Sequence, residues 1–423
     1  MAIQDLVPDS IPGQQVTDPA ALHGLRQYIA NLCQVQHTRF PGSQPVSFTQ
    51  DSLDLLEQRD FWVCEKSNGV RVMVLIMSNP ETSQEIYLID RNDKYYMNTE
   101  VYFPRHDSFE NLQTDTLLDA ELVIDVDPES GQHVLRLLLF DCLVVNGENI
   151  MHKPLLSRYG RLREFVVAPH LHFHKVSGPQ MLARQPFEIK LKPQELAYGI
   201  EAVFKNHLPK LQHGNDGLIF TCAESAYTPG TDPYILKWKP PEENSIDFKL
   251  QLRFPAKLDS PDHADYTQKP IFALYESGGY EGDRFFDILA VSDEEWSRMK
   301  STGEQYDGRV VECVWNSAEQ NWKILRFRDD KRQGNFKDIV QKIIQSIQDG
   351  VEAPALIERA YAIRKAFKAR AQERASGARP LQVIPPAPQP IHVAAEDAAV
   401  PYLPLPSMSP FVTRPTALRL NVE

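Results

Sequence analysis

The residues best suited by type to covalent chemistry lie in the stretch WVCEKSNGVRVMVLIM, where Lys66 occupies a predicted turn between two apolar runs and Gly69 relieves the backbone. A lysine is a nucleophile only as the neutral amine, and deprotonation at pH 7 costs about 4 to 5 kcal/mol from its reference pKa. Partial burial and nearby cations lower that pKa, and Arg71, Lys237 and Lys239 are candidates to supply the charge. From this fragment alone, a surface turn lysine is the more common explanation.

Two further motifs place charged residues on predicted strands. LLDAELV puts Glu121 in an apolar run, where an unpaired carboxylate would be costly to bury, so a functional role is favoured over a structural one. In RFRDDKR, alternation puts Arg326 and Arg328 on one face of a strand, which favours phosphate contact over a solvated charge run. Phe140 lies in an apolar run and, without other information, would be a core residue.

Three histidines, His170, His172 and His174, alternate in the sequence HLHFH. Imidazole is a common metal ligand, so this pattern is a candidate metal face. No cysteine or carboxylate ligand is close by in sequence, and we therefore expect a half-exposed strand here.

The composition of the chain limits the classes of function. A net charge of -12 argues against a protein that coats nucleic acid, because such proteins need many Lys and Arg contacts to phosphate. The basic side chains instead form short patches, at Lys237 with Lys239 and over 326–332. The five cysteines are widely spaced and suggest neither a disulfide framework nor a zinc ribbon. No apolar run approaches the roughly 18 to 20 residues of a membrane-spanning helix, and the first ten residues lack the features of a secretory signal, so no membrane association is expected.

The first part of the chain predicts an α+β domain built on antiparallel sheet, over 1–245. Asp18 as N-cap and Pro19 in the first turn indicate a helix. Strands are predicted at 61–64, 69–77, 85–90, 116–125 and 133–145, helices at 157–167 and 193–208, and two more strands in GLIFTC and YILKWK.

The second part predicts a small barrel and a helical end. Five short strands, at 246–254, 271–276, 285–291, 309–315 and 322–327, suit an OB-fold barrel over 246–335. Ser292 with Glu295 forms a capping box for a helix between the third and fourth strands. A C-terminal helical segment is predicted over 336–376. The remainder, 377–423, holds ten of the 32 prolines and is predicted to be a disordered tail.

The order of these motifs, from Trp62 to Asn335, resembles the mRNA capping guanylyltransferase family, in particular the monofunctional fungal type. This family belongs to the covalent nucleotidyltransferases, which include the ATP-dependent DNA and RNA ligases. The resemblance implies a nucleotidyltransferase domain with an OB-fold lid. It also implies that Lys66 in EKSNGVR is the nucleophile that stores GMP.

The resemblance assigns further residues to the nucleotide. Arg71 follows the nucleophile in the first motif, Arg91 in YLIDR lies near the sugar, Glu121 contacts ribose or metal, and Phe140 stacks on guanine. Asp216 in NDGLIFT is linked to metal or orients the lysine. In LKWKPPEENSIDF, Lys237 and Lys239 meet the α-phosphate and Asp247 the nucleotide phosphate site. In WKILRFRDDKRQGN, Arg328, Asp330 and Lys331 meet the β and γ phosphates.

The chain departs from the family pattern at two positions. Asn68 stands where the family usually has Asp, and Ala120 stands where it usually has Gly. Losing the carboxylate beside Lys66 would tend to lower the lysine pKa and to weaken its orientation. Asn can still accept a hydrogen bond, so we expect reduced precision rather than loss of function.

The family mechanism implies GTP as substrate, Mg²⁺ (or Mn²⁺) as cofactor, and a 5′-diphosphate RNA end as acceptor. No HCxxGxxR phosphatase signature occurs, so a separate RNA triphosphatase subunit is expected to prepare the RNA. The family also implies a nuclear location and docking to the phosphorylated C-terminal domain of RNA polymerase II.

Two alternative functions remain at this point. An ATP-dependent polynucleotide ligase shares the lysine chemistry, although the spacing of Arg328, Asp330 and Lys331 favours the capping branch. A noncatalytic nucleotide-binding scaffold would explain Asn68 as decay. Retention of Lys66 and Glu121 together with Lys331 argues against it.

Overall fold

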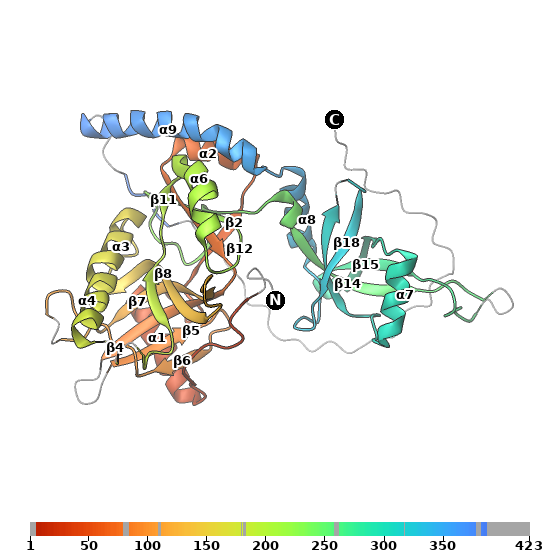
Figure 1. The fold of residues 1–423 in the computed structure, drawn as a ribbon, viewed down its shortest axis with the longest axis horizontal. Helices are drawn as coiled ribbons and strands as arrows, with labels where there is room; N and C mark the ends of the chain where they lie inside the picture. The colour runs from red at the N-terminus through yellow and green to blue at the C-terminus, as the bar shows by residue number, and fades with distance from the viewer. Residues whose placement is uncertain are drawn as a thin grey trace. The chain divides into compact units, whose positions relative to one another are not determined.

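The chain folds into two compact units in a computed structural model that describes residues 6–78, 84–108, 111–178, 180, 183–257, 262–316, 318–377 and 382–386. The first unit comprises the described parts of Met1–Lys239 and Glu352–Gln389 (Figure 1), and the second contains Pro240–Val351. The chain therefore passes from one unit to the other twice, after Lys239 and after Val351. Among the described residues, no helix has the length and apolar character needed to cross a membrane.

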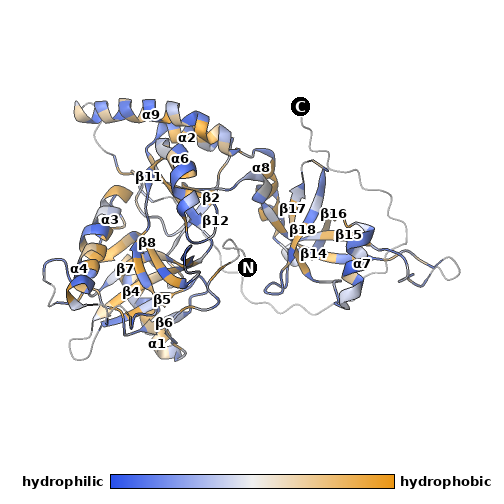
Figure 2. Cartoon of the chain, viewed as in Figure 1, coloured by the Kyte–Doolittle hydropathy of each residue, from blue (hydrophilic) through white to orange (hydrophobic). Residues whose placement is uncertain are grey.

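The larger sheet of the first unit has the strand order β1-β6-β5-β4-β7-β8-β10, with β9 paired to β8. Its strands are β1 (Gln14–Gln15), β4 (Val70–Ser78), β5 (Gln84–Ile89), β6 (Tyr95–Asn98), β7 (Thr116–Val126), β8 (His133–Val145), β9 (Glu148–Asn149) and β10 (Glu188–Leu191). All pairings are antiparallel except that of β10 with β8. Along β4, Val72 and Val74 join one core cluster whereas Met73 and Leu75 join another. Burial on both faces explains the continuous apolar run of this strand, which is coloured as hydrophobic in Figure 2.

A second sheet of the first unit carries the candidate nucleophile. Its order is β11-β3-β12-β13-β2. The strands are β2 (Ser43–Ser47), β3 (Phe61–Ser67), β11 (Glu195–Leu196), β12 (Asn215–Cys222) and β13 (Gly230–Trp238). Lys66 lies on β3, and β12, which contains Asp216, pairs antiparallel with both β3 and β13. The strands predicted in GLIFTC and YILKWK thus flank one another and bring their charged residues to the strand of Lys66.

Short helices cover the sheets of this unit. They are α1 (Pro19–Cys33), α2 (Gln50–Gln58), α3 (Leu155–Arg161), α4 (Ala168–Ser177) and α6 (Ile200–Ala202). Asp18 caps α1 as predicted, because its carboxylate accepts a hydrogen bond from the Ala21 amide at 2.8 Å. Helix α2 was not predicted, although Thr49 and Ser52 form a capping box at its start.

The prediction of a strand for HLHFH is wrong, because the three histidines lie on helix α4. The helical pattern predicted over 157–167 continues through a π-helical stretch, Leu162–Val167, into α4. His170 then falls one turn after Val166, is 1% exposed and packs against Phe103 at 5.2 Å between ring centroids. A two-residue period read over five residues was too short to outweigh the helical spacing of the longer segment.

The second unit is the predicted five-stranded barrel. Its strands are β14 (Ser245–Arg253), β15 (Ile271–Ser277), β16 (Asp283–Ile288), β17 (Val310–Asn316) and β18 (Asn321–Phe327), in the order β16-β15-β14-β17-β18. An isolated parallel bridge between Leu289 and Trp322 connects the two outer strands and closes the barrel. Helix α7 (Asp293–Thr302) begins with the predicted capping box, in which Ser292 accepts from the Glu295 amide at 3.1 Å. This topology is that of an OB fold.

The predicted helical segment over 336–376 is divided between the two units. Helix α8 (Lys337–Gln348) packs on the barrel core through Val340, whereas α9 (Ala353–Ala375) belongs to the first unit. Arg370 and Arg374 of α9 form ion pairs at 2.8 and 2.6 Å with Asp60, next to α2. A uniform helical pattern cannot indicate that its two halves pack on different cores. Most of the predicted tail, 377–423, lies outside the described residues.

Candidate active site

Strand β3 presents Lys66 to Asp216, the residue that follows the first position of β12. The Lys66 Nζ lies 2.6 Å from Asp216 Oδ1, and the Lys239 Nζ lies 2.5 Å from Asp216 Oδ2. One carboxylate therefore bridges two of the lysines that the sequence analysis singled out. Because each carboxylate oxygen has its own ammonium partner, the Lys66 side chain is held in one place at the edge of the sheet.

A β-bulge aims Asp216 at Lys66. Asn215 pairs with Ser67 and Leu218 pairs with Glu65, so Asp216 and Gly217 together span the position opposite Lys66. Gly217 has φ of +144°, and a Cβ at this position would lie 2.0 Å from the carbonyl oxygen of Trp238. Only glycine combines this backbone conformation with such a close approach.

Positive charge exceeds negative charge around Asp216. Burial alone would raise the pKa of Asp216, but Lys66 and Lys239 hold it below its usual value. Lys237 lies on β13, next to Trp238. Burial, and then repulsion from Lys239 and Lys66, lowers the pKa of Lys237. Three ammonium groups thus share one carboxylate, and this imbalance favours an anionic ligand such as a phosphate.

Arg71, on β4, is compensated by a buried acid. Its Nε and Nη2 donate to the two oxygens of Asp119 at 2.9 and 2.5 Å, and its Nη1 donates to the Ser43 carbonyl. Asp119 is fully buried and also accepts from the Tyr227 hydroxyl at 2.5 Å. The charge of Arg71 is therefore balanced by Asp119 rather than directed at Lys66.

A second bulge places Phe140 at a cavity of the first unit, which Lys66 and Arg71 also line. Asp119 pairs with Asp141 and Ala120 pairs with Leu139, which leaves Phe140 as the extra residue of β8. Both Phe140 and Asp141 consequently line the same cavity, although adjacent strand residues normally point to opposite faces. The guanidinium of Arg71 lies 5.7 Å from the centre of the Phe140 ring. Phe140 is half-buried and lines the cavity.

Lys192, which the sequence analysis missed, is a buried cation of the cavity. It follows β10, is 3% exposed and donates to the Ser67 hydroxyl at 2.7 Å. Its Nζ lies 3.3 Å from Glu65 and 3.7 Å from Glu121. Burial would lower the pKa of Lys192, but Glu65 raises it, so the ammonium stays charged. In EIKLKP the lysines alternate with apolar residues, and nothing local distinguishes Lys192 from the exposed Lys190.

The cavity brings most of the predicted residues of the first unit together. Arg91 lies in the exposed turn after β5, and Glu121 lies on β7. The predicted residues that line the cavity are Lys66, Arg71, Arg91, Glu121 and Phe140. Asp216 and Lys239 adjoin it through their ion pairs. No group of three or more His, Cys, Asp or Glu side chains in the described ranges is arranged to hold a metal by itself.

The remaining predicted residues form a separate cluster in the second unit. Asp247 on β14 accepts from Arg328 Nη1 at 3.2 Å and pairs with Lys331. Arg328 also pairs with Asp330 at 2.7 Å and Glu312 at 3.3 Å. The hydrogen bond from Arg328 lowers the pKa of Asp330 to about 2. The cations predicted to meet phosphates are thus paired with carboxylates in this conformation.

The sequence of this chain matches two domains of a known protein family. They are "mRNA capping enzyme, catalytic domain" over residues 7–241 and "mRNA capping enzyme, C-terminal domain" over residues 243–357. The chain is 37% identical over 369 residues to the mRNA-capping enzyme subunit alpha of Neurospora crassa, covering 83% of this chain and 91% of that protein. It is 40% identical over 347 residues to the protein of the same name in Schizosaccharomyces pombe, covering 81% and 85%.

Solved structures give a more distant likeness. A mycobacterial DNA ligase D complexed with ATP and MES is 13% identical, with 69% of this chain and 95% of that chain covered and a TM-score of 0.36. The ATP-dependent DNA ligase from bacteriophage T7 in complex with ATP is 16% identical, with 68% and 98% covered and a TM-score of 0.33. Likenesses at this level carry no argument about function.

Proposed function

The chain belongs to the mRNA capping enzyme family, and we propose from this premise that Lys66 is the residue on which it stores GMP. It is an mRNA guanylyltransferase that takes GMP from GTP and transfers it to the 5′ end of RNA. The observation that supports Lys66 is its ion pair with Asp216 at the edge of a cavity, beside Lys237 and Lys239. Among the lysines of this cluster, it is the one that lines the cavity.

The first half-reaction forms a bond between the Lys66 nitrogen and the α-phosphorus of GTP while the bond to pyrophosphate breaks. The attacking group is the neutral amine, which gives up one proton as the phosphoramidate forms. Asp216 orients the amine through its 2.6 Å contact. Lys237 and Lys239 stabilise the negative charge that develops on the phosphate oxygens.

The second half-reaction reverses the role of Lys66. An oxygen of the 5′-diphosphate end of RNA attacks the same phosphorus, and the bond from phosphorus to the lysine nitrogen breaks. The nitrogen takes up a proton as it leaves, which returns Lys66 to its starting state. In this proposal Phe140 stacks on guanine, and Arg91 and Glu121 contact the sugar; all three residues line the same cavity.

We propose that a divalent cation, Mg²⁺ or Mn²⁺, binds at this site together with the phosphates of GTP. The described residues offer no three-carboxylate cage, but Mg²⁺ commonly takes one or two carboxylates together with substrate phosphates. Glu121 and Asp216 are the candidates to hold it. Bound there, the ion would neutralise charge on the phosphoryl oxygens.

Arg328 and Lys331 of the second unit are proposed to bind the β and γ phosphates of GTP, and Asp247 and Asp330 are proposed to be the carboxylates at this phosphate site that hold the two cations when no phosphate is bound. Their present ion pairs support a role with exchangeable anions, because a phosphate oxygen can replace a carboxylate oxygen at the same guanidinium or ammonium.

We further propose the partners that this chemistry requires. The relatives are called subunit alpha, which supports a second subunit, and an RNA triphosphatase subunit would supply the diphosphate end. Docking to the phosphorylated C-terminal domain of RNA polymerase II, in the nucleus, would deliver nascent RNA.

Labelling with GTP tests the proposed nucleophile. The protein is incubated with α-³²P-labelled GTP or ATP and magnesium, and the adduct is detected on a denaturing gel. We expect an acid-labile GMP adduct in the parent protein and in Lys205→Ala, whose lysine is exposed and pairs with Glu201 on the same helical segment. Lys66→Ala should give none. An AMP adduct would indicate a ligase, and labelling of Lys66→Ala would show that the nucleophile is elsewhere.

A further inference from the structure

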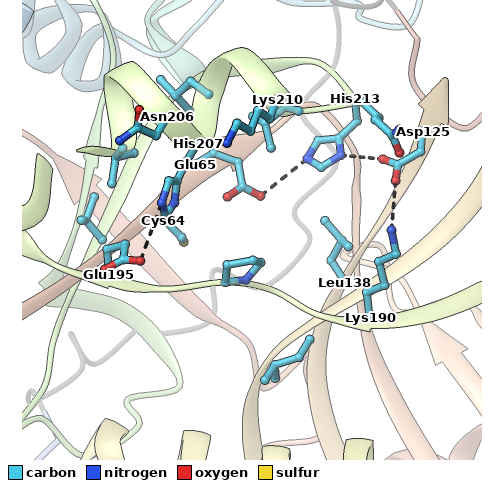
Figure 3. A pocket seen from close by; sticks show the side chains of 17 residues that line it. Cys64, Glu65, Asp125, Leu138, Lys190, Glu195, Asn206, His207, Lys210 and His213 are labelled. Carbon is cyan, nitrogen blue, oxygen red and sulfur yellow. Dashed lines mark hydrogen bonds and ion pairs between the residues drawn. The ribbon is translucent and has the colours of Figure 1, made fainter. Parts of the chain in front are cut away.

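A network of buried charged side chains includes Glu65 of β3, the strand that also carries Lys66. Figure 3 shows a second pocket of the first unit, in which His213 points toward both Glu65 and Asp125. The His213 Nδ1 lies 2.7 Å from Asp125 Oδ1, and its Nε2 lies 3.5 Å from Glu65 Oε1. All three side chains are less than a tenth exposed. The imidazole is thus hydrogen-bonded to Asp125 and lies within ion-pair distance of Glu65, while its buried Nε2 makes no hydrogen bond in this conformation.

The same network of contacts extends to Lys192, which lines the cavity at Lys66. The Glu65 Oε1 that faces His213 is also 3.3 Å from the Lys192 Nζ. Lys192 lines the cavity and donates to the Ser67 hydroxyl, which in turn donates to Glu65 at 3.2 Å. A displacement of Glu65 would therefore move the ammonium of Lys192 within the cavity.

The protonation state of His213 decides how many of its two carboxylate neighbours, Asp125 and Glu65, it can offer an N–H to at once. A neutral imidazole has one N–H and can donate to only one of the two carboxylates, whereas the imidazolium has an N–H for Asp125 and a second one that faces Glu65 at 3.5 Å. Burial alone would lower the pKa of His213, but Asp125 and Glu65 raise it above its usual 6.5. Burial would likewise raise the pKa of Glu65, but Lys192 and His213 lower it to about 2.

Other charged groups surround the pocket without replacing His213. Asp125 also pairs with Arg136 and lies 3.8 Å from Lys190, while His207 lies 3.8 Å from Glu195. The titratable side chains that line the pocket are Cys64, Glu65, Asp125, Lys190, Glu195, His207, Lys210 and His213. The salt bridges to Glu65 come from His213 and Lys192, so His213 is the residue that ties it to Asp125.

We propose that His213 is a positioning residue of the guanylyltransferase reaction, which holds Glu65 and through it sets the place of Lys192 in the nucleotide cavity. The inference rests on the proposed function, because it assigns the cavity to GTP. His213 itself does not touch the reacting atoms. Its effect should fall on the binding of GTP more than on the chemical step at Lys66.

The KM for GTP in adduct formation tests this role, with His213→Gln compared with His133→Gln. His133 is an exposed histidine at the start of β8 and is the matched control. We expect His213→Gln to raise the KM about tenfold, the scale of one disturbed hydrogen bond to a charged group, with a smaller change in the maximal rate. In the parent protein the KM should rise as pH increases through the pKa of His213. In His213→Gln it should be high and independent of that titration.

A second variant keeps the histidine, in case His213→Gln does not fold. Asp125→Asn leaves His213 in place and removes one of its two carboxylate partners. Titration of the His213 imidazole by NMR should give a pKa above 6.5 in the parent protein and a lower one in Asp125→Asn. The variant should also show a raised KM for GTP.

The outcomes separate this inference from the proposed function. If the parent protein forms no GMP adduct, the proposed function fails, while the NMR titration and equilibrium binding of GTP still report on His213. A His213 that titrates at or below 6.5 in the parent protein would overturn the positioning role. So would an unchanged GTP dependence in both variants, and so would a loss of thermal stability with no change in the pH profile.

Discussion

The two charged clusters of this protein are built on opposite principles. The lysine cluster of the first unit consists of Lys66, Lys237, Lys239 and Asp216. The arginine cluster of the second unit consists of Asp247, Glu312, Arg326, Arg328, Asp330 and Lys331. The first has three cations for one carboxylate, whereas the second has equal numbers of each sign.

This difference indicates how each cluster would treat a phosphate. The lysine cluster has an excess of positive charge before any ligand is present, so an anion completes it. The arginine cluster is internally neutral, so a phosphate must displace carboxylates that already occupy the same donors. A site that keeps GMP covalently bound suits the first arrangement. A site that binds and then releases pyrophosphate suits the second, because its own carboxylates can take the donors back.

The sharpest test of the lysine cluster is the loss of its nucleophile. Lys66→Arg retains positive charge next to Asp216 but cannot attack, because a guanidinium remains protonated at any pH the protein tolerates. We expect no GMP adduct from Lys66→Arg on a denaturing gel, together with near-normal binding of GTP. A measurable adduct would mean that the charge of this cluster matters and the identity of the nucleophile does not.

The second test changes the backbone conformation of the β-bulge at Gly217 while keeping every charged residue. Gly217→Ala should cost about 2 to 4 kcal/mol in the free energy of unfolding, because a Cβ would meet the Trp238 carbonyl in a conformation that alanine avoids. Adduct formation should fall by roughly 100-fold, since Asp216 would be misplaced by about 1 Å.

Gly131→Ala is the matched control for this variant. Gly131 also has positive φ, at +70°, but a Cβ there meets nothing within 4 Å. It should lose about 1 to 2 kcal/mol in unfolding and none of the adduct rate. Equal effects at the two glycines would show that the bulge at Asp216 is not specially required.

The sequence predicted these clusters unequally. Lys66 and Asp216 were assigned through the resemblance of their motifs to the family, and the five barrel strands followed from apolar runs bounded by turns. The bulge that turns Phe140 into the cavity did not, because a bulge depends on the register of two strands far apart in sequence. Lys192 and His213 were missed for a similar reason: their partners, Glu65 and Asp125, are distant along the chain. The carboxylate partners of Arg328 inside the barrel were likewise not foreseen.

The third test addresses the arginine cluster. Arg328→Ala and Lys331→Ala should each lower the rate of adduct formation from GTP by about 10- to 100-fold, the scale of a charge-assisted hydrogen bond. Transfer of GMP from a preformed adduct to RNA should change by less than about threefold, because no pyrophosphate is present to need stabilising charge. Single-turnover measurements of the two half-reactions separate these effects. Equal losses in both would mean that the arginine cluster holds the nucleotide or RNA throughout, like the lysine cluster.

The smallest effect is expected at Asp330, the most exposed carboxylate of the arginine cluster. Its side chain is 63% exposed, so its pair with Arg328 should contribute less than about 1 kcal/mol to stability. The pKa of Asp330 is lowered from 3.8 to about 2, so this contribution is present above pH 3.8 and is lost as pH falls toward 2. Thermal unfolding of Asp330→Asn should therefore differ slightly from the parent protein at pH 7, and the difference should vanish near pH 2. A difference that persisted in acid would show that Asp330 acts through contacts other than its charge, and the arginine cluster would then have fewer exchangeable carboxylates than the comparison requires.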